Sequence, residues 1–321
     1  MKTFQPIVLM LLVLVAAAPI AAADYPARPI RIIVPFTPGG STDILARMIG
    51  QRLTQAWGQQ VVVDNRPGAN GVVGAELTAK ANPDGHTLLF VAIGHAINPL
   101  LQKKMPYDTE RDFAPVSLVA ILPLILTVHP TVKAGSAQEL IALAKSGAKP
   151  LNYASGGIGS SQHLATALMG HMAGLKLNHV PYKGGNQGLV DLVAGHVNMM
   201  ITSTLTVIPH AKAGRLRALA VTTSKRIAAL PDLPTISEAA LRGYESIAWY
   251  GMVAPAGLPS GVLAKLSAET IKATNSADMR NALVKQGAEP VGNTPREFSA
   301  FIKSEMTKYA RVIKETGVMA E

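Results

Sequence analysis

The chain of 321 residues contains no cysteine, and this absence excludes several classes of protein. No disulfide can form, so the hydrophobic core must stabilise the fold even in an oxidising compartment. A leader that is anchored through an acylated cysteine is excluded for the same reason. A dense metal site would have to use histidines and carboxylates alone. Because no motif brings such residues together, we predict neither a metal nor a cofactor.

Aromatic residues are scarce, at 5% of the chain, which argues against a surface that stacks nucleic-acid bases. The formal net charge is +10, from 30 Lys and Arg against 20 Asp and Glu. These basic residues are scattered along the sequence and form no cluster of the kind that binds nucleic acid. The charge is compatible with an anionic small molecule, and we predict no nucleic-acid partner.

The standard catalytic motifs are also missing. The sequence has no H-E-x-x-H and no P-loop ending in Gly-Lys-Ser/Thr. Gly159 stands where a nucleophile elbow needs a serine. An exported serine-type hydrolase that uses Ser160 or Ser161 with His163 is the enzymatic alternative, although the spacing indicates no acidic partner for the histidine. We predict a protein without catalytic activity.

A run of apolar residues, 7–17, follows Lys2 and precedes three alanines, 21–23. A positive residue, a short apolar stretch and an A-x-A site are the parts of a secretory signal peptide. The run is too short for a comfortable membrane span. We therefore predict a signal peptide over residues 1–23, cleavage after Ala23 and a periplasmic location. Because Lys2 is the only charged residue of this leader, cleavage lowers the formal charge from +10 to +9.

Beyond the leader, short β-rich runs alternate with longer amphipathic runs, which predicts the α/β class with mostly parallel sheets. The predicted strands are Ile30–Val34, Val61–Asp64, Thr87–Val91, Val116–Ala120, Ile125–Val128, Asn152–Ala154, Asn198–Ile201, Leu216–Thr222 and Ile247–Val253. The predicted helices are Thr42–Trp57, Val72–Ala81, Ala137–Lys145, Gln162–Met172, Gly188–Ala194, Ser260–Thr274, Asp278–Lys285 and Pro295–Thr316.

The sequence has no Gly/Ser/Pro-rich linker that would separate two halves. Two lobes must therefore be joined by strands that cross between them, and we expect Leu122–Val128 to lead out and Ile247–Val253 to lead back. Lobe 1 is predicted over 24–124 and 249–321, and lobe 2 over 125–248. In such a layout the strand-to-helix loops of both lobes face one cleft, where ligands bind at the carboxyl ends of the strands.

Three glycine-rich loops follow predicted strands and open predicted helices: Pro38–Asp43, Asn65–Gly71 and Ala154–His163. Ser41 and Thr42 stand where they can cap the first helix, and Ser160 or Ser161 can cap the third. Such loops direct backbone N–H groups and the positive ends of helix dipoles at one point. Together they would bind a carboxylate without any arginine.

Other residues near these loops are weaker candidates. The strand that ends at Ile201 continues into the hydroxyl residues Thr202 and Ser203, at the end expected to face the cleft. Lys183 is either a charge at the mouth of the cleft or an ordinary solvated lysine. Trp249 and Tyr250, in the returning strand, are predicted to pack in the core or the hinge in preference to stacking on a ligand.

The chain resembles the periplasmic receptors of tripartite tricarboxylate transporters, also called Bug-type receptors, along essentially the whole mature sequence. No single motif carries the resemblance, which depends on an ordered set. The matching stretches are Val34-Pro35-Phe36 with Pro38-Gly39-Gly40 and Asp43; Pro67-Gly68-Ala69 with Gly71 and Gly74; Tyr107-Asp108 with Asp112-Phe113-Ala114-Pro115-Val116; Leu151-Asn152-Tyr153-Ala154-Ser155 with Gly159-Ser160 and His163-Leu164; His179-Val180-Pro181-Tyr182-Lys183-Gly184; Ala213-Gly214-Arg215-Leu216-Arg217; and Ala254-Pro255-Ala256-Gly257.

The resemblance implies a two-lobed type II periplasmic binding protein fold that closes over one small organic carboxylate. It also implies a monomer that delivers its ligand to membrane permease subunits. Carried over position by position, it implies ligand contacts at Phe36, Gly40, Ser41, Thr42, Asp43, Ala69 and Gly71 in lobe 1 and at Ser155, Gly159, Ser160 and His163 in lobe 2. Thr202 and Ser203 complete the predicted set.

The chain departs from the family pattern at two places. Thr202 stands where the family usually has an aspartate, and this loss favours a less cationic or more anionic ligand. Gln187-Gly188 replaces the usual Pro-Ala near the start of a lobe 2 helix. The sequence is equally compatible with a transport receptor and with a ligand-sensing partner of a signalling system.

Overall fold

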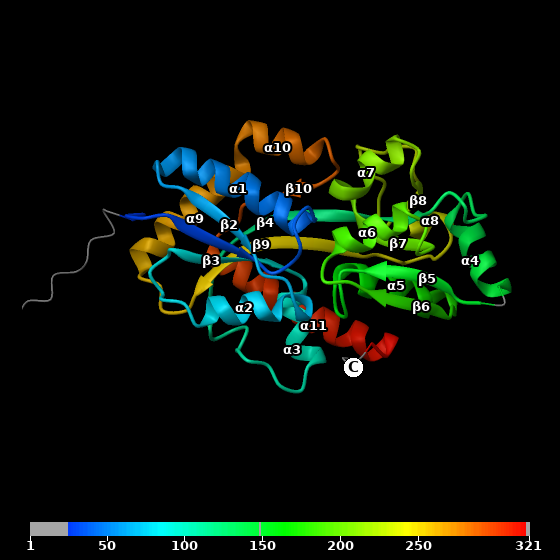
Figure 1. The fold of residues 1–321 in the computed structure, drawn as a ribbon, viewed down its shortest axis with the longest axis horizontal. Helices are drawn as coiled ribbons and strands as arrows, with labels where there is room; N and C mark the ends of the chain where they lie inside the picture. The colour runs from blue at the N-terminus through cyan, green and yellow to red at the C-terminus, as the bar shows by residue number, and fades with distance from the viewer. Residues whose placement is uncertain (1–24, 148, 319–321) are drawn as a thin grey trace, which may run out of the picture.

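The computed structural model describes residues 25–147 and 149–318. The predicted signal peptide, 1–23, lies outside these residues. The described chain forms two α/β lobes that lie side by side along the long axis of the molecule (Figure 1). No helix within the described ranges is both long enough and apolar enough to cross a membrane.

The lobes share two long strands and otherwise contain separate elements. Lobe 1 contains β1 (Ile30–Val34), α1 (Ser41–Trp57), β2 (Val61–Asn65), the 3₁₀ helix η2 (Ala69–Gly71), α2 (Val72–Ala79), β3 (Thr87–Ala92), α3 (Gly94–Leu101), α9 (Ser260–Asn275), α10 (Ala277–Val284), β10 (Glu289–Pro290) and α11 (Pro295–Thr316). Lobe 2 contains α4 (Ala137–Ser146), β5 (Leu151–Ser155), α5 (Ser161–Ala173), β6 (Leu177–Pro181), α6 (Gly185–Val193), β7 (Met199–Ser203), α7 (Thr204–Lys212), β8 (Arg217–Val221) and α8 (Ile236–Ala239). The shared strands are β4 (Phe113–Val128) and β9 (Ile247–Pro255).

One continuous path of strands runs through both lobes, in the order β2-β1-β3-β9-β4-β7-β5-β6. The pairs β1–β2, β1–β3, β5–β6 and β5–β7 are parallel, whereas β9 and β4 are antiparallel to their neighbours. β4 pairs with β9 as far as Pro123 and with β7 from Leu124 onward. The predicted lobe boundary at 124/125 lies next to this change of partner.

The parallel strands of lobe 1 are covered on both faces, which explains their continuous apolar sequence. Leu45 and Ile49 of α1 pack with Ile32 on one face of the sheet, together with α9. On the other face, Ile33 packs with residues of α2, α3 and α11. Figure 1 shows these two layers above and below the sheet.

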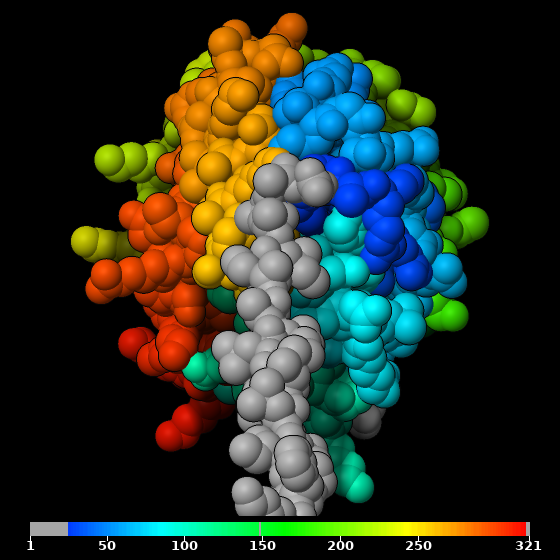
Figure 2. Space-filling model, turned by 90° about the vertical axis from the view of Figure 1, so that its left-hand side faces the viewer, coloured from blue at the N-terminus to red at the C-terminus, as the bar shows by residue number. Residues whose placement is uncertain are grey.

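The N-terminal and C-terminal parts of the described chain meet in lobe 1. In Figure 2 the first helix region (blue) and the region of α9 and α10 (orange) lie side by side on the end face of this lobe. Arg52 of α1 donates a hydrogen bond to Ser276 and forms an ion pair with Asp278. The C-terminal helices therefore return to lobe 1, as the sequence predicted. α11 also extends far enough to contact α5 of lobe 2.

The structure corrects several predicted elements. The expected strands 116–120 and 125–128 are one strand, β4, in which Pro123 falls where the pairing changes from β9 to β7. Six elements were not predicted. They are α3 and α7, each with an internal proline, the edge strand β6, which is rich in polar residues, and the short elements η2, α8 and β10. The helix predicted to begin at Gly188 begins three residues earlier, at Gly185.

Candidate ligand-binding site

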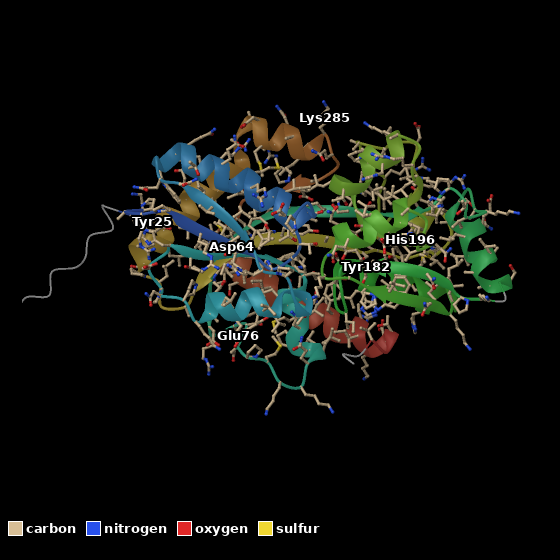
Figure 3. The ribbon with its side chains drawn as sticks, in the orientation of Figure 1. Tyr25, Asp64, Glu76, Tyr182, His196 and Lys285 are labelled. Atoms are coloured by element: carbon tan, nitrogen blue, oxygen red, sulfur yellow. The ribbon has the colours of Figure 1, made fainter. Side chains whose placement is uncertain are left out.

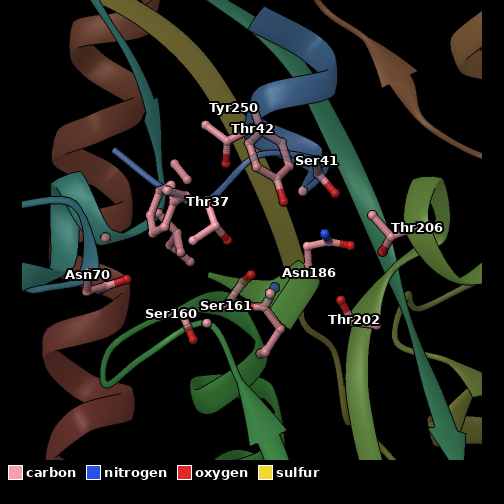
Figure 4. Close-up of a pocket in the computed structure, with 18 residues that line it drawn as sticks. Thr37, Ser41, Thr42, Asn70, Ser160, Ser161, Asn186, Thr202, Thr206 and Tyr250 are labelled. Carbon is pink, nitrogen blue, oxygen red and sulfur yellow. The ribbon is translucent and has the colours of Figure 1, made fainter. Parts of the chain in front are cut away.

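A cavity lies between the lobes, beyond the carboxyl ends of β1 and β3 (Figure 4). Its volume is about 40 Å³, several times the space that one water molecule needs. Its 18 lining residues come from both lobes and from β9. They are Phe36, Thr37, Gly40, Ser41, Thr42, Asn70, Ala92, Ile93, Gly94, Gly156, Ser160, Ser161, Gln162, Gly185, Asn186, Thr202, Thr206 and Tyr250.

The polar side chains of this wall are neutral. Hydroxyl groups come from threonines, serines and a tyrosine, and amides come from Asn70, Gln162 and Asn186. Among the described residues, no aspartate, glutamate, lysine, arginine or histidine lines the cavity. No group of three or more metal-ligating side chains occurs in the described part of the chain. An ion in this cavity would be held by hydrogen bonds from hydroxyl, amide and backbone groups, without a charged side chain.

Four helices begin at the cavity wall. Ser41, Gly94, Ser161 and Gly185 are the first residues of α1, α3, α5 and α6, and all four line the cavity. The first turn of a helix presents N–H groups that have no intrahelical partner, and its dipole places partial positive charge there. The convergence of four such ends creates a positive environment without a charged side chain, which favours a bound anion.

The first glycine loop is held from behind by Asp43. Its carboxylate accepts hydrogen bonds from the Gly39 nitrogen (3.0 Å) and the Asn65 amide (2.9 Å) and pairs with Arg47. Burial alone would raise the pKa of Asp43, but its bonds to Arg47, Gly39 and Asn65 lower it below the usual value. Asp43 therefore stays ionised and faces away from the cavity wall, so its role is to position the loop.

The α1 prediction is corrected in one detail. Ser41 and Thr42 are not caps, because the N-cap residue is Gly40, which makes no side-chain capping bond. Both hydroxyl residues belong to the first helical turn and line the cavity. Ser160 is the N-cap of α5, as predicted, since its hydroxyl accepts from the His163 backbone nitrogen.

The two lobes contact each other around the rim of the cavity. Asn186 at the start of α6 donates a hydrogen bond to the Pro38 carbonyl of lobe 1 (3.1 Å). Gly39 has φ 81°, and a Cβ on it would lie 2.9 Å from the Asn186 amide nitrogen. Gly184 lies so close to Thr37 that a Cβ there would overlap the threonine hydroxyl. The lobes are therefore in a closed arrangement that depends on the absence of side chains at these glycines.

The loop that carries Gly184 is braced within lobe 2. Tyr182 donates a hydrogen bond to Asp191 on α6, and the Tyr182 nitrogen donates to the Ser155 carbonyl (3.0 Å). Figure 3 shows Tyr182 on the side of lobe 2 that faces lobe 1, with His196 farther out. Lys183, next to Tyr182, is exposed and does not line the cavity.

A stack of aromatic rings supports the third glycine loop. The rings of His163 and His179 are nearly parallel with centroids 4.1 Å apart, and Tyr153 stacks on His179 at 4.8 Å. The His163 ring accepts a hydrogen bond from the Gly159 nitrogen (3.1 Å). The His179 ring bonds the Ser155 hydroxyl (2.6 Å). The pairing of β5 with β6 sets Tyr153 beside His179, and His163 joins them from the first turn of α5.

Both histidines are neutral near pH 7. Burial lowers the pKa of His163 to about 3, and repulsion by His179 adds to this effect. Burial also lowers the pKa of His179 to about 4. A neutral imidazole can accept the Gly159 N–H, which an imidazolium cannot do. The stack therefore fixes the loop geometry and adds no positive charge.

The predicted site residues divide into two groups. Phe36, Gly40, Ser41, Thr42, Ser160 and Thr202 line the cavity. The other seven do not. Asp43, Ser155, Gly159 and His163 support the loops through the bonds described above. A Cβ on Gly71 would lie 3.6 Å from the Phe36 ring, Ala69 is exposed, and Ser203 caps α7.

The sequence missed several lining residues. Tyr250 was predicted to pack in the core or hinge, but it lines the cavity, whereas its neighbour Trp249 is in the core and donates to Glu305 (3.0 Å). The alternation of side chains along β9 could have indicated that the two neighbours face opposite ways. Asn186 was missed because the start of α6 was placed three residues too late.

The geometry does not support the hydrolase alternative. The Ser160 hydroxyl bonds the backbone nitrogen of His163, and the His163 ring bonds Gly159. In the described part of the chain, neither the Ser160 hydroxyl nor the Ser161 hydroxyl is hydrogen-bonded to the His163 ring. A serine nucleophile needs its hydroxyl bonded to the ring of its base, and this contact is missing.

Comparisons with known proteins agree with this reading. Residues 45–318 match the tripartite tricarboxylate transporter family receptor. BugT of Bordetella pertussis is 39% identical over 307 residues, which cover 94% of this chain and 93% of BugT. A protein of R. palustris solved with adipate has a TM-score of 0.90 at 37% identity, covering 92% of this chain and 99% of that one. MatC from Rhodopseudomonas palustris, with bound malate, has a TM-score of 0.85 at 31% identity, covering 90% and 100%.

These similarities extend over nearly the whole chain and involve the sequence as well as the fold. The family consists of periplasmic binding proteins, not enzymes. The chain therefore belongs to the tripartite tricarboxylate transporter receptor family and is a solute-binding protein of the two-lobed periplasmic type.

Proposed function

We propose that this protein captures a small organic carboxylate between its lobes and delivers it to the membrane permease of a tripartite transporter. It does so as a monomer, after export and removal of residues 1–23. The proposed contacts are the lining residues predicted from the sequence, together with Thr37, Asn70, Ser161, Asn186 and Tyr250.

One observation carries the proposal: four helix N-termini converge on a cavity that no charged side chain of residues 25–147 or 149–318 lines. An amine or other cation would meet the positive ends of these dipoles without any carboxylate to offset them. A carboxylate would instead accept hydrogen bonds from backbone N–H groups and hydroxyls. The similar proteins solved with adipate and malate support the same ligand class.

Thr202 adds to the argument because it lines this cavity and is buried. An aspartate at this position would place a negative charge beside the ligand. The neutral threonine leaves the cavity free for the ligand's own negative charge, so we propose a dianionic or monoanionic acid without an amine.

The first experiment is calorimetric titration of the protein that begins at Asp24 with adipate, malate and the corresponding diamides. Mass spectrometry of the denatured protein first establishes whether a ligand was retained during purification. We expect at least one carboxylate to bind and its diamide not to bind. Absence of binding by any acid to protein shown to be ligand-free would contradict the proposal.

A pair of variants at one position tests the electrostatic argument. Thr202→Asp should weaken carboxylate binding by about a hundredfold, because like charges about 5 Å apart repel by about 3 kcal/mol at an effective dielectric constant of 20. Thr202→Val removes only the hydroxyl and serves as the matched control, with an expected loss of about tenfold or less. Equal losses in the two variants would show that charge at this position does not matter.

A further inference from the structure

A second, smaller cavity lies beside the first in lobe 1. Its volume is about 10 Å³, close to the space that one water molecule needs. Phe36 and Ala92 line both cavities, so they form the partition between them. The remaining wall is largely apolar, with Leu89 and Val91 of β3 and Ala75 of α2.

Two polar side chains in this apolar wall have no hydrogen-bond partner. Both ring nitrogens of His95 and the hydroxyl of Tyr107 are buried and unpaired within the described chain. The two residues are only 6% and 7% exposed. Asn98 lies near Tyr107 and bonds Asn70 in both directions, at 3.0 Å each way, but within the described chain it makes no hydrogen bond of normal geometry to the Tyr107 hydroxyl. Buried polar groups are nearly always paired, so this arrangement calls for an occupant.

The two side chains are held in place by packing. The His95 ring stacks on Tyr107 with centroids 6.4 Å apart and meets the edge of Phe113 at 4.9 Å. The Tyr107 ring also contacts Phe113 at 5.3 Å. Because these three rings fix one another, neither His95 nor Tyr107 can turn toward a new partner without disturbing the core.

The chemistry of the pair defines what it can bind. Burial lowers the pKa of His95 to about 4, so the ring is neutral and offers one N–H donor and one acceptor. Tyr107 offers a hydroxyl that both donates and accepts. Neither residue supplies a positive charge, so a carboxylate in this cavity would be a buried ion without a counter-charge. A hydroxyl group, which donates and accepts at once, matches the pair.

We propose that this second cavity is a side pocket of the ligand site, and that it receives the hydroxyl at the far end of an organic acid whose carboxylate lies in the main cavity. The hydroxyl pairs with His95 and Tyr107, the hydrocarbon part contacts the apolar wall, and Phe36 turns aside to admit it. This inference rests on the proposed function and narrows its ligand class to acids with an apolar spacer and a distal hydroxyl.

The test compares matched acids in calorimetric titrations at pH 7. One series contains unbranched ω-hydroxy acids of four to eight carbons, and the other contains the same acids with a methyl group in place of the hydroxyl. At the best chain length we expect the hydroxy acid to bind at least tenfold more tightly than its methyl counterpart. In Tyr107→Phe and His95→Phe this preference should disappear, with binding of the methyl acid unchanged or stronger.

Two controls separate the possible failures. Ala75→Val fills the side pocket without touching the main cavity, and it should abolish the hydroxyl preference even if His95→Phe fails to fold. If the wild-type protein binds acids of both series equally at every length, the pocket holds only a water molecule and the inference is wrong. If it binds no acid of either series and no dicarboxylate, the proposed function itself fails, and the side pocket fails with it.

Discussion

At the scale of single residues, the site depends on groups that stay uncharged or that keep their charge away from the cavity. Asp43 is ionised and only 4% exposed, yet its partners are Gly39, Asn65 and Arg47, none of which lines the cavity. The ligand cavity therefore receives N–H groups of the first loop without receiving the carboxylate. His163 and His179 likewise bond Gly159 and Ser155 without lining the cavity themselves.

Asp43→Asn should lower the free energy of unfolding by about 2 kcal/mol, because a buried bond to a charged group contributes about 1.5–3 kcal/mol. Ligand affinity should fall as well, since Gly39 loses its anchor. The matched control is Asp278→Asn, whose ion pair with Arg52 is 74% exposed on the aspartate side and should contribute less than about 1 kcal/mol. Urea denaturation measures both changes. A loss as small for Asp43 as for Asp278 would show that the loop does not depend on this carboxylate.

At the scale of elements, each lobe brings the start of several helices to one surface because its parallel strands all end there. β5 and β6 run parallel, so Tyr153 and His179 occupy paired positions in the sheet and stack on each other. His163 reaches the same stack from the first turn of α5. This stack is an internal part of lobe 2, and its protonation should affect the stability of that lobe.

Because His163 and His179 are buried in this stack, the free energy of unfolding should depend on pH above the range in which carboxylates titrate. The unfolded chain takes up protons on these histidines near pH 6.5, whereas the folded chain does so only near pH 3 to 4. Because the unfolded state binds more protons in between, stability must fall as the pH drops from 6.5 toward 4. His163 alone should account for about 2 kcal/mol between pH 6.5 and 4.5.

Urea denaturation at a series of pH values measures this slope. His163→Gln lowers stability at pH 7 but removes the proton uptake, so its slope should be smaller than that of the wild type. His171→Gln, at an exposed position of the same helix, should leave the slope unchanged. Parallel curves for all three proteins would show that the stack does not couple protonation to folding.

At the scale of the whole molecule, closure depends on how tightly lobe 2 fits against the first loop of lobe 1. Gly184 has φ 165° and ψ 151°, an extended conformation that any residue adopts, so no backbone strain requires glycine there. What requires it is Thr37 of the other lobe, whose backbone nitrogen would lie 3.1 Å from an added Cβ and whose hydroxyl would overlap it. The glycine is thus a condition for closure, and lobe 2 can fold without it.

Gly184→Ala should therefore leave the thermal stability of the ligand-free protein nearly unchanged and weaken carboxylate binding by at least tenfold. Small-angle scattering with saturating ligand should show a more open particle than the wild type. Gly135→Ala is the control, because a Cβ there has no atom closer than 3.5 Å and lies far from the lobe contact. Wild-type affinity in Gly184→Ala would mean that Thr37 moves aside at no cost.

The sequence by itself determined the α/β class, most strands and helices and the three glycine loops, and it predicted an anionic ligand. These predictions follow from local patterns: apolar periodicity, the position of glycine after a strand, and hydroxyl residues at the starts of helices. The tertiary structure decided which side chains meet. Tyr250 and Asn186 reach the cavity, and His163 meets His179, because strand order and lobe closure bring together positions far apart in the sequence. No local sequence pattern predicts how Gly184 fits against Thr37, or that the polar groups of His95 and Tyr107 are unpaired within the described chain. Each feature depends on which residues another segment of the chain places beside it.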